Sequence, residues 1–233
     1  MMAAIACAEP YLSLHTTLRQ SLADRLGPGI GIACTGVEGD PRRLYPEEFA
    51  AVSRAVPRRQ REFAAGREAA RQAMAQIGWA PVAIPSAPDR SPVWPKGLAG
   101  SITHSAGACV AVVCPQSLWQ AVGIDLEEDQ PMEPALWDTI CTPEEAAFVN
   151  TQPAVLRGRW VTWLFSAKEA FYKWQYPQTR HTLEFQDVRV LLPHMGFPTN
   201  FRIVQARTGT TPGIRGECLA RNGHLLTWVI GNV

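Results

Sequence analysis

The chain has 233 residues, 46% of them hydrophobic and 18% charged, which is enough to bury the core of one large domain or of two smaller halves. Its 22 basic and 21 acidic residues leave a formal charge of +1, so the composition excludes a general electrostatic attraction to nucleic acid or to an anionic membrane. The longest apolar run, around residues 108–114, is far shorter than the roughly 18 to 20 residues of a membrane-spanning helix. Residues 1–8 lack the basic start and the length of a secretory signal, and we expect a cytoplasmic protein in which recognition of anions is local.

Six cysteines are scattered along the sequence without a Cys-x-x-Cys pair. This spacing favours neither a disulfide framework nor a zinc site, because free cysteines commonly behave as small buried hydrophobic residues. We expect that behaviour for Cys7, Cys34, Cys109, Cys114, Cys141 and Cys218.

Charge is distributed unevenly along the chain. Residues 54–71 carry six arginines and two glutamates, whereas residues 125–145 carry eight carboxylates and no lysine or arginine. One segment attracts anions and the other attracts cations, so two separate pieces of chain can build a site for a polyanion and a metal ion. The alternative at this point is that both segments are solvated faces of ordinary helices and loops.

Helix start and stop signals and short apolar runs predict the elements of the first part of the chain. Pro57 and Gly78 are typical of a helix start and stop, and residues at helical spacing between them predict a helix over residues 57–77. Short apolar runs predict three strands after it, over residues 98–104, 108–114 and 119–126.

The second part of the chain repeats this order. The capping-box pattern of Thr142 and Glu145 predicts a short helix to about residue 150, and an apolar stripe predicts a longer helix over residues 153–176. Three strand candidates follow, over residues 183–192, 201–206 and 219–230, the last interrupted by a turn. The recurrence predicts an α+β fold of two similar helix-plus-three-strand halves, residues 1–117 and 118–233, packed as a pseudo-dimer. A cofactor-sized ligand is expected in the cleft between such halves.

Two carboxylates share one side of the predicted strand over residues 119–126. Asp125 and Glu127 are two positions apart and therefore point together, while Ile124 and Leu126 pack inward. Carboxylates held side by side repel each other unless a positive charge lies between them, and Mg²⁺ prefers such oxygen ligands. The alternative is that the pair ends an edge strand in solvent.

The predicted helix over residues 153–176 carries a third carboxylate and two lysines. Glu169 and Lys173 are four positions apart and share a helix face, whereas Lys168 is offset by one position. Beside a metal-binding strand, these groups suit the charge of a pyrophosphate. Taken alone, Glu169 and Lys173 would be a surface ion pair worth about 0.3 to 0.5 kcal/mol.

A serine and a histidine occur on the strand that precedes this region. Ser101, His104 and Asp125 would supply the residue types of a hydrolase triad, but no Gly-x-Ser-x-Gly elbow surrounds Ser101 or Ser105. We therefore expect no nucleophilic serine chemistry.

Four sequence elements occur in a fixed order. Upstream stand Arg61-Glu62-Phe63-x-x-Gly66-Arg67-x-x-Ala70-Arg71 and Pro92-Val93-Trp94-Pro95-x-Gly97-x-x-Gly100-Ser101-Ile102-Thr103-His104. Gly123-Ile124-Asp125-Leu126-Glu127 comes next, and about forty residues later Phe165-Ser166-x-Lys168-Glu169-Ala170-x-x-Lys173. Together they resemble the 4'-phosphopantetheinyl transferases, and among them the two-halved, surfactin-type members that include the enterobactin-synthase transferases.

The resemblance implies an enzyme that moves the 4'-phosphopantetheine group of coenzyme A to a serine of an apo acyl or peptidyl carrier protein and releases 3',5'-ADP. It implies a Mg²⁺ site formed by Asp125, Glu127 and Glu169. For the mechanism, we expect Glu169 to accept the serine proton, either directly or through a metal-bound water, and Lys173 to stabilise charge on the transferred group. The two-halved length implies a monomer.

The resemblance further implies how coenzyme A is held. Lys168 and Lys173 would contact the pyrophosphate and the pantetheine side. The adenosine end, chiefly its 3'-phosphate, would be bound by Arg59, Arg67 and His104, with Arg90 as the basic residue before the Trp-Pro element. Two alternatives use the same residues: a Mg²⁺-dependent phosphohydrolase with water as nucleophile, and a non-catalytic coenzyme A-binding module.

Overall fold

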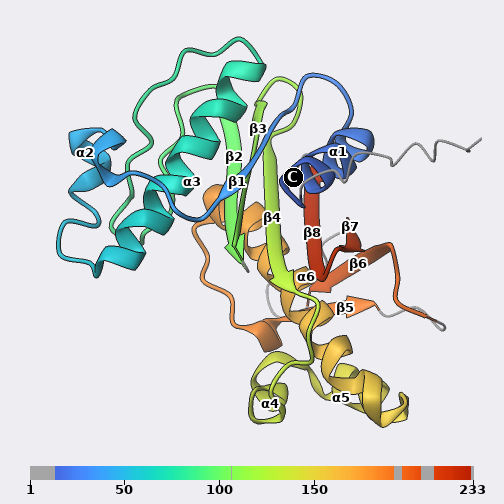
Figure 1. Cartoon of the computed structure of the whole chain (residues 1–233). Helices are drawn as coiled ribbons and strands as arrows, with labels where there is room; N and C mark the ends of the chain where they lie inside the picture. Colours follow the sequence, from blue (N-terminus) through green and yellow to red (C-terminus); the bar gives the residue numbers. More distant parts are fainter. Residues whose placement is uncertain (1–13, 106, 192–195, 206–212, 232–233) are drawn as a thin grey trace, which may run out of the picture.

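The structure is a computed structural model, and it describes residues 14–105, 107–191, 196–205 and 213–231. The protein has an α+β architecture with two antiparallel sheets, and a long helix packs on each sheet (Figure 1). Within the described part of the chain, none of the helices combines the length and the apolar character needed to cross a bilayer.

The first sheet has the strand order β1-β3-β2, formed by β1 (Gly31–Gly36), β2 (Leu98–Ser105) and β3 (Ala108–Pro115). Helix α3 (Pro57–Gln76) packs on this sheet through a row of buried alanines and Met74. The helix approaches very closely at Gly31, where a Cβ atom would lie 1.9 Å from the carbonyl oxygen of Ala73. Glycine at this position therefore sets the distance between helix and sheet.

The second sheet has the strand order β4-β8-β7-β6-β5, formed by β4 (Ala121–Glu128), β5 (Val188–Leu191), β6 (Asn200–Gln205), β7 (Ile214–Arg221) and β8 (His224–Gly231). Helix α6 (Ala154–Thr179) covers it. A Cβ atom at Gly123 would lie 2.0 Å from the carbonyl oxygen of Ala170. The alternation of β4 therefore directs Gly123, Asp125 and Glu127 toward the helix.

The two sheets meet where β2 lies beside β4. The hydroxyl of Ser101 accepts a hydrogen bond of 3.0 Å from the backbone nitrogen of Ile124, and that of Thr103 accepts one of 3.1 Å from Leu126. Side chains of β2 thus satisfy backbone donors of the edge strand β4, which would otherwise be buried without partners. The opposite face of this junction is closed by α1 (Leu14–Leu26), whose buried Leu18 and Leu22 share a cluster with β4 and β8.

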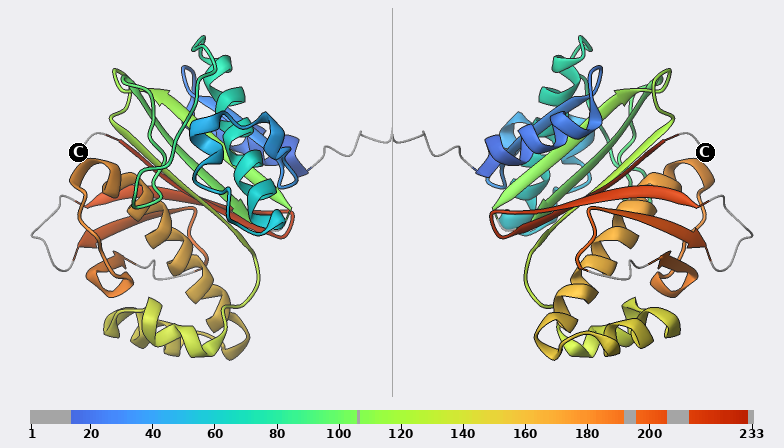
Figure 2. Two further views of the ribbon diagram at one scale, coloured as in Figure 1. Left: turned by 90° about the vertical axis from the view of Figure 1, so that its left-hand side faces the viewer. Right: turned by 90° about the vertical axis from the view of Figure 1, so that its right-hand side faces the viewer.

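Shorter elements complete the chain. Near α3 lie η1 (Pro41–Arg43) and α2 (Pro46–Phe49), and between β4 and α6 lie η2 (Pro134–Leu136), α4 (Trp137–Ile140) and α5 (Pro143–Thr151). The segment η3 (Phe185–Asp187) precedes β5. Figures 1 and 2 place α4 and α5 at the end of the molecule away from the first sheet.

Helices α3, α5 and α6 confirm the three predicted helices, and Thr142 and Glu145 form the predicted capping box. The predicted number of three strands is correct for the first half but wrong for the second, whose described residues form a sheet of five strands. The predicted strand over residues 119–126 pairs with β8 rather than with the first sheet, whose third strand is β1. The candidate over residues 219–230 is a hairpin of two strands that turns at Asn222 and Gly223, both with positive φ.

The described cysteines are free, and four of them, Cys109, Cys114, Cys141 and Cys218, are buried as expected. Cys34 is half-buried, and Cys7 lies outside the described residues.

Candidate functional site

Two pockets adjoin the junction of the sheets, and both are lined by Arg90. The first, of about 460 Å³, lies between β2 and α6, and its lining includes Ser101, Glu169, Lys173 and Tyr176. The second, of about 580 Å³, lies between α3 and the loop before β2, and its lining includes Arg59, Phe63 and Ser86. We call them the lysine pocket and the arginine pocket. Helix α3 thus contributes to one pocket and α6 to the other, and Arg90 lies between them.

Asp125 and Lys173 form the centre of the site. The side chain of Asp125 is 3% exposed, and its Oδ1 atom lies 2.5 Å from Lys173 Nζ and 3.4 Å from the hydroxyl of Thr103. The same ammonium lies 3.8 Å from Glu169 Oε2. Lys173 therefore stands between two carboxylates from different elements, because Gly123 lets α6 lie close against β4.

The third predicted carboxylate, Glu127, lies close enough to Asp125 and Glu169 to be affected by their charges. Burial, together with the charge of Asp125, raises the pKa of Glu127 to about 7. Burial also raises the pKa of Glu169, although the nearby ammonium of Lys173 opposes the shift. Raised carboxyl pKa values in a pocket are typical of groups that receive a cation or a proton during function.

The three carboxylates fit a hard divalent cation in their chemistry. The Oδ2 atom of Asp125 is buried and has no hydrogen-bond partner, and an oxygen in that state needs a donor or a metal ion. Among the described residues, no group of three or more His, Cys, Asp or Glu side chains is already gathered in a metal-holding arrangement. In this structure, the positive charge beside Asp125 and Glu169 comes from Lys173.

Arg59 and His104 come together at the arginine pocket's side of α3. One guanidinium nitrogen of Arg59 lies 3.4 Å from Nε2 of His104, and the same ring nitrogen lies 3.4 Å from Glu62 Oε2. Glu62 also lies 3.7 Å from the guanidinium of Arg59. The carboxylate of Glu62 therefore links the two basic residues. Glu62 is part of the sequence motif, but the sequence alone does not predict this role.

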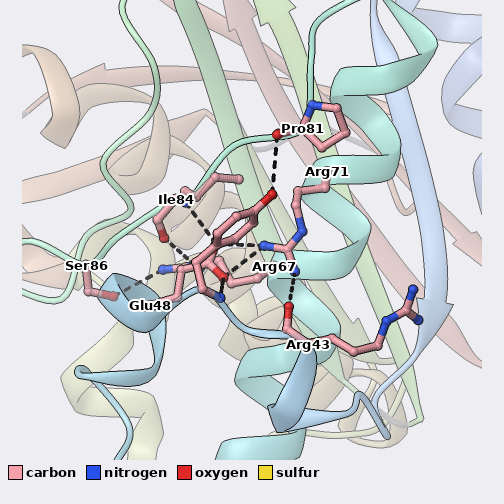
Figure 3. A network of polar contacts seen from close by, with 8 residues as sticks. Arg43, Glu48, Arg67, Arg71, Pro81, Ile84 and Ser86 are labelled. Carbon is pink, nitrogen blue, oxygen red and sulfur yellow. Dashed lines mark hydrogen bonds and ion pairs between the residues drawn. The ribbon is translucent and has the colours of Figure 1, made fainter.

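Arg67 is buried, and it contacts Ser86, which lines the arginine pocket (Figure 3). Its Nε atom donates to the carbonyl oxygen of Ile84 at 2.7 Å, and its Nη2 atom donates to the hydroxyl of Ser86 at 3.1 Å. Burial lowers the pKa of Arg67 to about 10, so it remains a cation near neutral pH. The sequence predicts direct binding of a phosphate by Arg67, whereas the structure places it in contact with Ser86, which lines the pocket.

A neighbouring carboxylate supports the same segment. Glu48 is fully buried, and it accepts hydrogen bonds from Arg71 Nη1 at 2.7 Å and from the backbone nitrogen of Ile84 at 2.8 Å (Figure 3). Two buried charged residues thus hold Ile84 and Ser86 at the start of the loop that carries Arg90. Glu48 lies far from Arg71 and Ile84 in the sequence, so local sequence patterns do not predict these contacts.

Lys168 is a predicted ligand-binding residue that lines neither the lysine pocket nor the arginine pocket. Its ammonium donates hydrogen bonds to the carbonyl oxygens of Ile140 at 2.7 Å and Phe185 at 2.9 Å, and to Glu145 Oε2 at 2.6 Å. An ammonium has three donors, and all three are used inside the protein. The predicted contact of Lys168 with a pyrophosphate is therefore corrected: it fastens α6 to the segments around α4 and η3.

Two family models match the chain, one in each half. Residues 47–114 match the family model described as 4'-phosphopantetheinyl transferase N-terminal domain, and residues 121–221 match the 4'-phosphopantetheinyl transferase superfamily. The 4'-phosphopantetheinyl transferase PptT of Mycobacterium tuberculosis is 39% identical over 162 residues, 68% of this chain and 70% of the relative.

Two further relatives give the same result. The 4'-phosphopantetheinyl transferase Npt of Nocardia iowensis is 33% identical over 66% of this chain and 72% of the relative. Enterobactin synthase component D of Escherichia coli is 34% identical over 61% of this chain and 70% of the relative. The residues that match the two family models include strands of both sheets and the side chains around Asp125 and Arg59, and the chain belongs to the 4'-phosphopantetheinyl transferase family of enzymes.

Proposed function

We propose that this transferase takes the 4'-phosphopantetheine group from coenzyme A, attaches it to a serine of an apo acyl or peptidyl carrier protein, and releases 3',5'-ADP, with Mg²⁺ as its metal ion. One observation carries the proposal: Lys173, beside Asp125 and Glu169, lines one pocket, and an adjoining pocket presents arginines. A substrate with a pyrophosphate and a separate terminal phosphate needs positive charge in two places.

The two pockets supply those places. Arg59 and Arg90 line the arginine pocket, and His104 stands beside Arg59, so we assign the adenosine end and its 3'-phosphate to this pocket. Arg67 does not line this pocket, but it donates a hydrogen bond to Ser86, which does. The lysine pocket would receive the pyrophosphate and the pantetheine side, next to Lys173.

Asp125, Glu127 and Glu169 would hold Mg²⁺, which when bound neutralises pyrophosphate charge. Glu169 would accept the proton of the carrier serine hydroxyl, directly or through a water, because it lines the lysine pocket beside the proposed metal site. The serine oxygen then forms its bond to the pantetheine-side phosphorus, while the bond from that phosphorus to the oxygen of 3',5'-ADP breaks. Lys173 would stabilise the charge on the transferred group.

We also propose that residues 1–117 and 118–233 are the two halves of a pseudo-dimer that works as a monomer. The supporting observations are that each sheet carries one long helix and that helices from both sheets contribute to the site. The lysine pocket is lined by residues of both halves, so neither half alone would form it.

The test is an incubation of the protein with coenzyme A, Mg²⁺ and a panel of apo carrier proteins, followed by mass spectrometry of the carriers. The panel includes carriers from siderophore, polyketide and fatty acid assembly. Gain of one phosphopantetheine group by a carrier, and no gain with EDTA or with a serine-to-alanine carrier, is the expected result. Release of free phosphopantetheine would indicate a hydrolase instead. Binding of coenzyme A that is indifferent to Mg²⁺, without turnover, would indicate a binding module.

A further inference from the structure

The loop from Ser86 to Pro92 contains an arginine in a strained backbone conformation. Arg90 has a φ of +69°, a left-handed conformation that costs a non-glycine residue about 1 kcal/mol or more. The turn is fixed by hydrogen bonds from Arg90 N to Ala87 O at 2.8 Å and from Ala87 N to Ser91 O at 2.9 Å. Glycine would adopt this turn without strain. An arginine at this position therefore points to a role for its side chain, which lines both pockets.

Asp89, the neighbour of Arg90, ties this loop to α6. Its Oδ1 atom accepts hydrogen bonds from the hydroxyl of Ser91 at 2.6 Å and from its backbone nitrogen at 2.9 Å. Its Oδ2 atom accepts from the hydroxyl of Tyr176 at 2.6 Å and from Arg180 Nη1 at 3.3 Å. The carboxylate therefore joins the loop before β2 to the C-terminal end of the helix that carries Glu169 and Lys173. We call this set of contacts the bridge.

The partners on α6 are themselves held in place. The guanidinium of Arg180 lies 5.6 Å from the centroid of the Tyr176 ring, and this ring stacks on Tyr172 with centroids 5.2 Å apart. Arg180 is the C-cap of α6 and has a φ of +57°. The bridge thus ends on an ordered turn of helix rather than on a free side chain.

The negative charge of Asp89 is unfavourable for binding a phosphate at this pocket. A carboxylate at the rim of a pocket that would receive phosphates repels the ligand, yet Asp89 lines the lysine pocket. Hydrogen bonds from Ser91 and Tyr176 lower the pKa of Asp89 to about 2, so it is ionised at every working pH. Its carboxylate oxygens accept from the protein's own hydroxyls, backbone and guanidinium.

We infer that Asp89 is a positioning residue, which through Tyr176 and Arg180 holds Arg90 at a fixed place between the two pockets. This inference rests on the proposed function. The bridge sets the distance between Arg90 and Lys173, and so the span over which coenzyme A presents its 3'-phosphate and its pyrophosphate. In this role Asp89 strengthens ligand binding through Arg90, because its own carboxylate oxygens are hydrogen-bonded within the protein.

A double-mutant cycle tests this dependence. Asp89→Asn, Arg90→Ala and the double variant are titrated calorimetrically with coenzyme A and with dephospho-coenzyme A, which lacks the 3'-phosphate. We expect Asp89→Asn to weaken coenzyme A binding about tenfold and dephospho-coenzyme A binding less. In the Arg90→Ala background, Asp89→Asn should change the affinity for coenzyme A no further. Additive losses would overturn the inference, as would equal losses for the two ligands.

Asp40→Asn is the matched control. Asp40 and Asp89 have side chains of the same 34% exposure, both pair with an arginine, and Asp40 does not line either pocket. Its substitution should leave both affinities unchanged. Tyr176→Phe removes one end of the bridge without changing charge, and should reproduce part of the Asp89→Asn effect; unchanged binding in Tyr176→Phe and Asp89→Asn would contradict the inference. Failure of the wild-type protein to bind coenzyme A would instead refute the proposed function, and with it the inference.

Discussion

Lys168 Nζ lies 2.6 Å from Glu145 Oε2, and both side chains are 1% exposed. Glu145 also accepts hydrogen bonds from the backbone nitrogens of Thr142 and Val190. A buried ion pair of this kind is satisfied only while both members are present, because each charge has lost its hydration. The pair therefore connects the start of α5, strand β5 and helix α6, one residue before Glu169.

Removal of Lys168 should destabilise the fold rather than the ligand site. Lys168→Met leaves Glu145 buried without its cation, and we expect the free energy of unfolding to fall by about 3 to 5 kcal/mol. Lys168→Met combined with Glu145→Gln should recover part of that loss. Urea denaturation curves of the wild type, Lys168→Met and the double variant measure these free energies of unfolding. A stable Lys168→Met protein with tenfold weaker coenzyme A binding would return Lys168 to the ligand-binding residues.

Glu169→Gln should abolish transfer while the protein keeps its fold. The amide retains the shape of the side chain but cannot accept the serine proton, and loss of a general base typically costs about 10²- to 10⁴-fold in rate. Transfer to an apo carrier is measured at saturating Mg²⁺ and coenzyme A, with circular dichroism as the check on folding. Near-normal rates would remove Glu169 from the chemistry.

Arg59 and Arg67, two of the arginines of α3, should behave differently. Arg59 lines the arginine pocket and is half-exposed, so Arg59→Ala should weaken binding of coenzyme A more than that of dephospho-coenzyme A. Arg67 is buried, and Arg67→Ala leaves the carbonyl of Ile84 without its donor, at a cost of about 1 to 3 kcal/mol of unfolding free energy. Calorimetric titration and thermal unfolding of both variants distinguish the two roles. An equal loss for both ligands in Arg59→Ala would argue against a 3'-phosphate contact.

Substitution of Gly123 should separate α6 from β4. A Cβ atom at this position would lie 2.0 Å from the carbonyl oxygen of Ala170, and overpacking typically costs about 1 to 3 kcal/mol, and more against backbone that cannot move aside. Gly123→Ala should therefore lower both the melting temperature and the transfer rate, since Lys173 moves away from Asp125. Gly36→Ala is the control in β1, because its Cβ atom would meet nothing closer than 4.0 Å. Equal stability of the two variants would contradict the close approach.

The described cysteines should be unreactive in the native protein. Burial raises the pKa of Cys34 and of Cys109 to about 12, whereas an unfolded thiol has a pKa near 8.5. At pH 8 only about one in 10⁴ of these groups is the reactive thiolate, against about one in four when unfolded. In a Cys7→Ser variant, a thiol reagent at pH 8 should label the protein rapidly only after denaturant is added. Fast labelling of the native protein would show that these thiols are accessible.

Much of the site follows from local sequence pattern. Helices α3 and α6 are predictable because proline, glycine and a period of 3.6 residues are contained in short windows of sequence. The shared side of Asp125 and Glu127 follows from strand alternation, and the proximity of Glu169 and Lys173 follows from the helix period. The order and spacing of the motifs are by themselves enough to indicate the family.

Other features depend on packing between distant segments. The strand order, the role of Ser101 and Thr103 in satisfying β4, and the bridge from Asp89 to Tyr176 join residues that no sequence window relates. The sequence shows that Lys168 and Arg67 are cations near the motifs, but not that their donors are used on Glu145, Ile84 and Ser86. Local periodicity determines which way a side chain points, whereas the tertiary structure determines which partner satisfies it, because a buried charge must be paired with whatever donor or acceptor the packed core brings within hydrogen-bond distance.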